Sequence, residues 1–132
     1  DAYLDVVEQA GLPALVREVE FVKSDDEKSA VVAKILDENP DIDGIFAGDD
    51  TMAAICLNVM KQRGLSAPGD IKVVGADGAR RTMTFMPDLT TVRQDIDRIG
   101  ELAAQSIIAL VNGEKPESNI KLPVELIEGK TA

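Results

Sequence analysis

The sequence predicts an α/β protein with a doubly wound, mostly parallel sheet and helices on both faces. Short apolar runs alternate along the chain with longer segments in which apolar residues recur every three or four positions. One short run, residues 71–76, is continuously apolar at its centre, as expected of a strand that is covered on both faces. Strands that alternate with helices imply parallel pairing through crossover connections.

The N-terminal third predicts two helices and one strand. Residues 2–9 have apolar side chains at helical spacing, and residues 19–22 are a short strand candidate. Ser24 and Glu27 form a capping box, in which each side chain accepts a hydrogen bond from the other residue's backbone. A helix is therefore expected over residues 25–39.

The middle of the chain repeats a strand-to-helix order. Residues 42–47 predict a strand, residues 51–63 a helix, and residues 71–76 the next strand. The pattern then loosens, and residues 78–88 indicate a loop or a short irregular helix. Residues 89–93 form a brief extended piece.

The last third predicts one long helix and one strand. Residues 95–112 carry apolar side chains every three or four positions and end before Gly113, a typical helix cap. Residues 120–127 alternate between apolar and polar side chains, which predicts a final strand.

Composition excludes several classes of function. The 132 residues carry 14 basic and 24 acidic side chains, a net charge of −10 that disfavours direct contact with nucleic acid. The absence of histidine removes imidazole catalysis, and a single cysteine, Cys56, within an apolar run indicates a buried, inert thiol. No apolar stretch approaches the roughly 18 to 20 residues that cross a bilayer. Because the chain begins in a helical pattern without Met, we expect a fragment of a longer protein.

Two longer motifs make the sequence recognisable. Residues 64–77 match G-L-x-x-P-x-D-I-x-V-V-G-x-D, and residues 87–94 match P-x-L-T-T-V-R-Q. With the run IFAGDDTMA at residues 45–53, these motifs closely resemble the LacI/GalR family of sugar-responsive repressors, and the match covers essentially the whole chain in order. The resemblance implies the type I periplasmic-binding-protein fold and the C-terminal part of an effector-binding domain.

The resemblance also implies a division of the chain. Residues 1–88 and 117–132 would form most of the C-terminal subdomain, and residues 89–94 would cross to the other subdomain. Residues 95–113 would be a helix of that N-terminal subdomain. The family binds its effector between the two subdomains, so this chain would supply one wall of the cleft.

Aspartates at the ends of predicted strands are the first candidate ligand residues, because open parallel sheets bind ligands beyond the carboxyl ends of their strands. Asp49 matches a family position that contacts effector hydroxyls, although an aspartate before a helix can also be its N-cap. Asp50 is expected to cap the helix that follows. Asp77 ends the next strand, and the family uses this aspartate on its effector.

Three further residues complete the candidate site. Gln94 corresponds to the family's crossover glutamine, which suits either ligand contact or support of the hinge. Arg80 can donate hydrogen bonds to an effector, although arginines in loops are usually solvated. Phe85 can stack on a sugar face.

The predicted function is effector sensing within a LacI-type DNA-binding regulator, with a sugar or sugar derivative as ligand. We expect no cofactor, no metal and no enzymatic activity. The intact protein would be a cytoplasmic homodimer that binds DNA through a helix-turn-helix domain absent from this chain, and no membrane contact is expected. A periplasmic sugar-binding protein of an ABC transporter is the alternative, because it shares the fold.

Two other functions fit the sequence less well. A phosphoacceptor receiver domain also combines an aspartate pair with a later aspartate, but the pair should lie near the N-terminus and a lysine should follow a later strand. A hydrolase with Asp49 and Asp77 as an acid/base pair is chemically conceivable. Neither a nucleophile nor a phosphate loop accompanies the two carboxylates.

Overall fold

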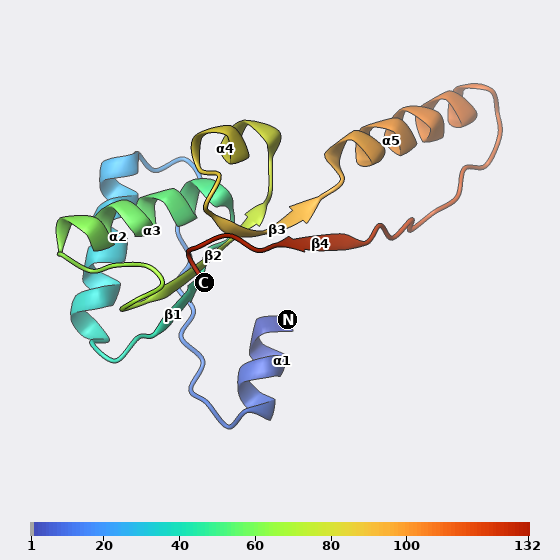
Figure 1. The fold of residues 1–132 in the computed structure, drawn as a ribbon. Coiled ribbons are helices and arrows are strands. Elements are labelled where there is room, and N and C mark those ends of the chain that lie inside the picture. Colours follow the sequence, from blue (N-terminus) through green and yellow to red (C-terminus); the bar gives the residue numbers. More distant parts are fainter. Residues whose placement is uncertain (1) are drawn as a thin grey trace.

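A single mixed sheet organises the protein in the computed structural model, which describes residues 2–132 (Figure 1). Strands β1, β2 and β3 are parallel, and β4 runs antiparallel to β3 at the edge. The spatial order follows the sequence: β1 (Gly44–Phe46), β2 (Lys72–Asp77), β3 (Thr90–Gln94) and β4 (Val124–Ile127). The mostly parallel α/β class predicted from the sequence is confirmed.

Five helices of the described residues accompany the sheet: α1 (Ala2–Gln9), α2 (Asp25–Glu38), α3 (Asp50–Gln62), α4 (Arg80–Phe85) and α5 (Ile96–Val111). The predicted capping box is present, because Ser24 Oγ accepts from the Glu27 amide and Glu27 Oε2 accepts from the Ser24 amide. Residues 78–88, predicted to be a loop or a short irregular helix, contain α4. Asp1 lies outside the described residues.

The core lies between α2, α3 and one face of the sheet. Val73 of β2 and Ala53 of α3 are both fully buried there, together with Met60. Cys56 is a buried free thiol, and burial raises its pKa to about 11, which agrees with the inert thiol predicted from the sequence. Phe46 and its register partner Val74 point to the opposite face, where Phe46 is largely exposed.

The strand predicted for residues 19–22 is wrong. These residues have no strand partner, and Phe21 and Val22 are each more than 80% exposed, at 87% and 86%. Apolar side chains alone do not make a strand, because the backbone also needs a neighbour for its hydrogen bonds. The final strand is shorter than predicted for a related reason: its pairing ends at Val124, opposite the last residue of β3, Gln94.

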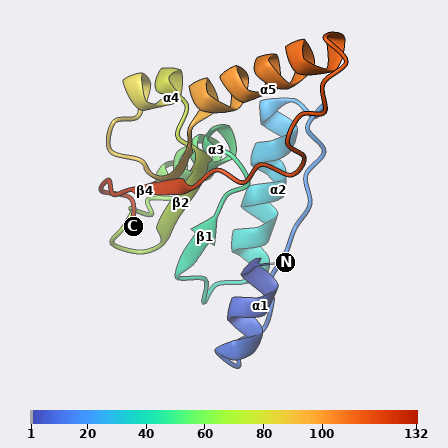
Figure 2. The ribbon, with the colours of Figure 1, turned by 90° about the vertical axis from the view of Figure 1, so that its right-hand side faces the viewer.

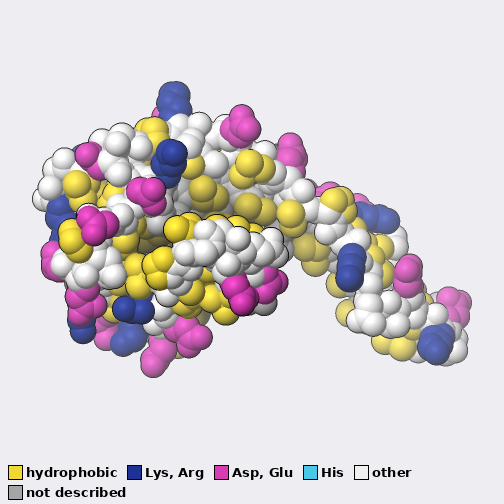
Figure 3. Space-filling view, turned by 90° about the horizontal axis from the view of Figure 1, so that it is seen from below, with side chains coloured by type: hydrophobic (Ala, Val, Ile, Leu, Met, Phe, Trp, Pro, Cys, Tyr) yellow, Lys and Arg dark blue, Asp and Glu magenta, His cyan; other side chains and the backbone are white. Residues whose placement is uncertain are grey.

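Helix α5 projects from the body as an arm, carried on β3 and on the segment that returns to β4 (Figures 1 and 2). No residue of α5 is buried, although the helix is rich in apolar side chains. Hydrophobic side chains gather across the underside of the body and continue along this arm (Figure 3). None of the helices within residues 2–132 has the length and apolar composition of a membrane-spanning segment.

Candidate ligand-binding site

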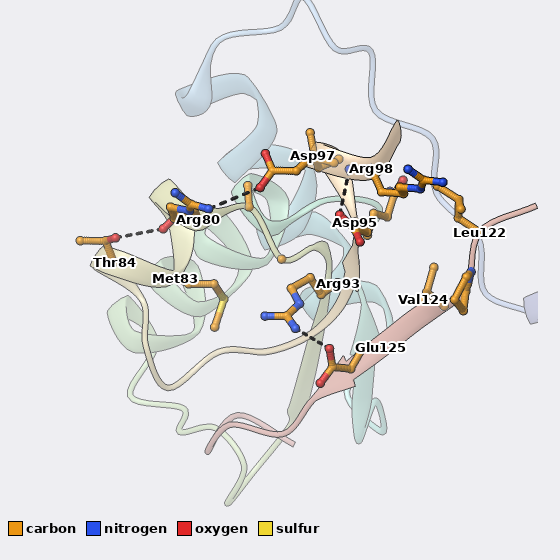
Figure 4. Close-up of a pocket in the computed structure, with 15 residues that line it drawn as sticks. Arg80, Met83, Thr84, Arg93, Asp95, Asp97, Arg98, Leu122, Val124 and Glu125 are labelled. Atoms are coloured by element: carbon orange, nitrogen blue, oxygen red, sulfur yellow. Dashed lines mark hydrogen bonds and ion pairs between the residues drawn. The ribbon is translucent and has the colours of Figure 1, made fainter. Parts of the chain in front are cut away.

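A wide, open hollow of about 990 Å³ lies where α4, the ends of β3 and β4, and the start of α5 meet (Figure 4). The hollow is at the junction between the body and the arm, beside the carboxyl end of β3. Two residues predicted from the sequence, Arg80 and Gln94, line it directly. Its position fits the rule that ligands bind beyond the carboxyl ends of parallel strands.

Asp77 and Gln94 are joined at the edge of this hollow. Gln94 Nε2 donates a hydrogen bond of 2.7 Å to Asp77 Oδ1. Asp77 ends β2 with a φ of 95°, a left-handed conformation that is uncommon outside glycine and that recurs at functional sites. The structure therefore brings together two residues that are 17 positions apart in the sequence.

Gly78 allows this close approach of β2 and β3. Its φ is 58°, and a Cβ placed on it would lie 2.6 Å from the Cβ of Arg93. Any larger residue would push Arg93 away from the strand end. The glycine thus permits both the left-handed turn after Asp77 and the packing of the crossover strand beside it.

Ion pairs cross the hollow from two sides. Arg80 of α4 pairs with Asp97 in the first turn of α5 at 3.4 Å, and Arg93 of β3 pairs with Glu125 of β4 (Figure 4). All four side chains are substantially exposed, so the pairs contribute little to stability. The arginines nevertheless have carboxylate partners in the described structure, and the charge of this wall is locally balanced.

The residue predicted to cap α3 needs correction. Asp49 has an extended backbone and is the N-cap of α3, because its Oδ1 accepts from the Met52 amide at 2.7 Å. Asp50 is already inside the helix and does not cap it. Its side chain is 3% exposed, and Oδ1 accepts a 2.5 Å hydrogen bond from Thr91 of β3. The prediction that Asp50 is the cap was wrong by one residue.

Phe85 lies apart from the hollow. It ends α4, is 76% exposed and does not belong to the residues that line the cavity. Asp49 is also absent from the lining, since it follows β1, which lies on the other side of β2 from β3. Arg80 and Gln94 line the hollow, and Asp77 lies beside Gln94 without lining it. The ligand contacts of all five residues stay predictions.

Several lining residues were not predicted from the sequence. Arg93 directly precedes Gln94 in the recognised motif, and that adjacency is the signal that identifies it. Asp97 and Glu125 carry no such signal, because only the start of α5 and the pairing of β4 with β3 bring them to the hollow. Among residues 2–132, no cluster of acidic and cysteine side chains is arranged to hold a metal ion.

Comparison with known proteins places this arrangement in a family. A family model described as a periplasmic binding protein-like domain matches residues 1–132. The chain belongs to this family.

Repressors of bacterial operons are relatives of this periplasmic binding protein-like domain. The chain is 30% identical to the ribose operon repressor of Halalkalibacterium halodurans, over 99% of this chain and 39% of the relative. It is 31% identical to the transcriptional repressor PurR of Yersinia pestis, over 98% of this chain and 38% of the relative. The chain spans about two fifths of the length of these relatives.

Solved structures of transcriptional regulators are also similar to this chain. A complex of the transcriptional regulator CelR with cellobiose superposes with a TM-score of 0.82 at 26% identity, over 98% of this chain and 40% of that one. A LacI family regulator from Arthrobacter in complex with lactose gives a TM-score of 0.79 at 26% identity, over 97% of this chain and 48% of that one. The resemblance to LacI-type regulators stated from the motifs is confirmed.

Proposed function

We propose that this chain is the C-terminal part of a sugar-responsive effector domain in a LacI-type transcriptional regulator. The observation that carries the proposal is the hydrogen bond between Gln94 and Asp77 at the edge of the hollow beside the crossover strand. Asp77 and Gln94 end the two recognised sequence motifs, and both are candidate ligand residues. Relatives that are repressors, and regulators solved with cellobiose or lactose, support the same function.

The unused hydrogen-bonding atoms at this edge define the ligand's chemistry. Gln94 uses one N–H of its side-chain amide on Asp77, which leaves the second N–H as a donor and the amide oxygen as an acceptor. Asp77 retains Oδ2, and an ionised carboxylate only accepts. The edge therefore offers two acceptors and one donor, which suits sugar hydroxyls because each hydroxyl can both donate and accept. A neutral sugar therefore fits this edge better than a phosphate ester, which mainly accepts.

The individual residues take different roles in the proposed site. Asp77 and Gln94 bind hydroxyl groups, and Arg80 contributes a donor once the ligand displaces its exposed contact with Asp97. Asp49 uses one carboxylate oxygen as the helix cap and offers the other to the ligand. Phe85, at the end of α4, provides an apolar surface for a sugar ring.

The exposed apolar surface of α5 supports the proposed division into subdomains. In this arrangement residues 1–88 and 117–132 belong to one subdomain, residues 89–94 cross over, and residues 95–113 pack within the other. The arm geometry agrees, because α5 leaves the body with no buried residue. Effector binding in the cleft would change the closure of the two subdomains and thereby the affinity for DNA.

For the longer protein we propose a cytoplasmic homodimer without enzymatic activity. It would bind operator DNA through a helix-turn-helix domain outside this chain. A periplasmic sugar carrier shares the fold, but the repressors among the relatives favour the regulator. The net charge of −10 agrees with a sensor segment that does not itself touch DNA.

A ligand screen on the full-length protein that contains this chain tests the proposal. Neutral sugars, including ribose, lactose and cellobiose, are added and the thermal midpoint is measured, since a ligand of the native state raises it. We expect one or more neutral sugars to stabilise the wild type and to fail to stabilise Asp77→Asn. The matched control is Asp41→Asn, an exposed position before β1. Stabilisation that survives Asp77→Asn unchanged contradicts the site.

A further inference from the structure

A buried carboxylate lies behind the proposed site and takes no part in the ligand contacts described above. Asp50, the first residue of α3, is 3% exposed, and Thr91 in the middle of β3 is fully buried. Thr91 Oγ1 donates to Asp50 Oδ1 at 2.5 Å. This bond ties the start of a helix to the crossover strand, 41 positions further along the chain.

A third segment approaches the same carboxylate. Gly75 of β2 is the register partner of Thr91, and a Cβ placed on it would lie 2.5 Å from Asp50 Oδ1. That Cβ would also lie 3.2 Å from Leu89 Cδ2 and 3.3 Å from Ala53 Cβ. The missing side chain of Gly75 therefore makes the space in which the carboxylate reaches Thr91.

The energetics of this cluster favour a positional role. Asp50 Oδ2 is buried without a hydrogen-bond partner among the described residues, and a single neutral hydroxyl compensates the other oxygen. Burying an incompletely paired carboxylate costs free energy, and an apolar side chain of similar size would usually be more stable at such a position. Stability alone does not account for an aspartate here.

Each of the three segments carries one predicted ligand residue close to this cluster. Asp49 directly precedes Asp50, Asp77 follows Gly75 by two residues, and Gln94 follows Thr91 by three. We propose that the Asp50–Thr91 hydrogen bond is a positioning contact that holds these three ligand residues in their mutual arrangement. The inference rests on the proposed function, and Asp50 acts through its neighbours without touching the sugar.

The test compares two substitutions of Thr91 in the full-length protein. Thr91→Val keeps the shape and removes the hydroxyl donor, whereas Thr91→Ser keeps the donor. We expect Thr91→Val to weaken the binding of the neutral sugar found by the ribose, lactose and cellobiose screen at least tenfold. Thr91→Ser should bind the sugar with a Kd within about twofold of the wild type, because serine keeps the hydroxyl donor.

A second variant separates positioning from a general loss of stability. Val73 lies in the same sheet and is fully buried, and its side chain makes no hydrogen bond to Asp50 or Thr91. Val73→Ala is therefore the matched control. Affinities are measured well below every midpoint, where all variants are folded. Val73→Ala should lower the thermal midpoint and leave the sugar Kd within about twofold of the wild type. If Thr91→Val behaves in the same way, its role is structural and the inference is wrong.

A readout without ligand distinguishes failure of this inference from failure of the proposed function. The side-chain amide of Gln94 in ¹⁵N-labelled protein reports its bond to Asp77. Thr91→Val should shift this resonance and accelerate exchange of its protons, whereas Val73→Ala and Thr91→Ser should not. An unchanged Gln94 resonance in Thr91→Val overturns the positioning role. A wild type that binds none of the sugars overturns the proposed function. The Gln94 resonance would still report whether the Asp50–Thr91 hydrogen bond positions Gln94.

Discussion

The side-chain amide nitrogen of Gln94 lies 2.7 Å from Oδ1 of Asp77 and donates a hydrogen bond to it. The two residues end neighbouring parallel strands, where Asp77 is the register partner of Arg93. This bond orients both side chains before any ligand arrives. Preorganised polar groups of this kind give specificity because little ordering remains to be done on binding.

Replacement of Gln94 by leucine tests this preorganisation. We expect Gln94→Leu to weaken sugar binding by about 1.5 to 3 kcal/mol, the range for a hydrogen bond to a charged group. Because Gln94 is exposed, the free energy of unfolding should change by less than about 0.5 kcal/mol. Calorimetry and urea denaturation of the full-length protein measure the two effects. Gln62→Leu, at the exposed end of α3, is the matched control and should retain wild-type affinity.

The charge of the effector is the second prediction. The acceptors of Asp77 and Gln94 should favour a neutral sugar, so adding a phosphate to the sugar that binds should weaken its affinity about tenfold or more, equivalent to about 1.4 kcal/mol. Competition calorimetry with the sugar and its phosphate ester measures this ratio. Tighter binding of the ester, lost in Arg80→Ala, would instead assign the hollow to an anionic ligand.

The capping role of Asp49 gives a third prediction. Asp49→Ala removes the acceptor for the Met52 amide and should lower the free energy of unfolding by about 1 kcal/mol. Asp49→Asn keeps a capping oxygen, and its stability should stay within a few tenths of a kcal/mol of the wild type. Urea denaturation followed by circular dichroism compares the two variants. Equal stability of Asp49→Ala and the wild type would show that the cap contributes nothing.

The space at Gly75 gives a fourth prediction. Gly75→Ala would place a methyl group 2.5 Å from Asp50 Oδ1 in a buried position and should destabilise the protein by about 1 to 3 kcal/mol. Gly44→Ala, in β1, is the matched control, since nothing lies within 4 Å of its added Cβ. Chemical denaturation measures both variants. A Gly75→Ala protein as stable as Gly44→Ala would mean that the cluster around Asp50 is loosely packed.

The buried thiol gives the fifth prediction, on pH. Burial raises the pKa of Cys56 from 9.0 to about 11, so the native protein keeps its proton while the unfolded chain loses it. The contribution to stability is fully present below pH 9 and is lost as the pH rises from 9 to 11. Cys56→Ala should remove this alkaline component from the stability profile. At pH 8, iodoacetamide should modify Cys56 slowly in the native protein and rapidly in urea, whereas fast native modification would contradict burial.

Local chemistry made much of the fold predictable. The capping box at Ser24 and Glu27, the helical spacing of α5 and the apolar centre of β2 each depend on residues that are neighbours in the sequence. The boundaries of α2 and α3 were accordingly correct to within one residue. The motif that ends at Gln94 likewise identified a residue that lines the hollow.

Features that depend on a distant partner were not predictable in this way. Residues 19–22 have the composition of a strand, but no neighbouring strand accepts their hydrogen bonds. The lining of the hollow by Asp97 and Glu125 follows from the direction of α5 and from the antiparallel register of β4. Such placements depend on contacts between segments that are far apart in the sequence.

The pair Asp49 and Asp50 shows most clearly which features the sequence predicts and which depend on the tertiary structure. The sequence by itself determined that a carboxylate would cap α3 and that aspartates would stand at the ends of two parallel strands. Only the tertiary structure decided which aspartate caps, because Asp49 keeps an extended backbone and Asp50 enters the helix. One residue of helix rotates the side chain by about 100°, which turns Asp50 inward to Thr91 of β3. The partner that receives it lies 41 positions away, and only folding brings it there.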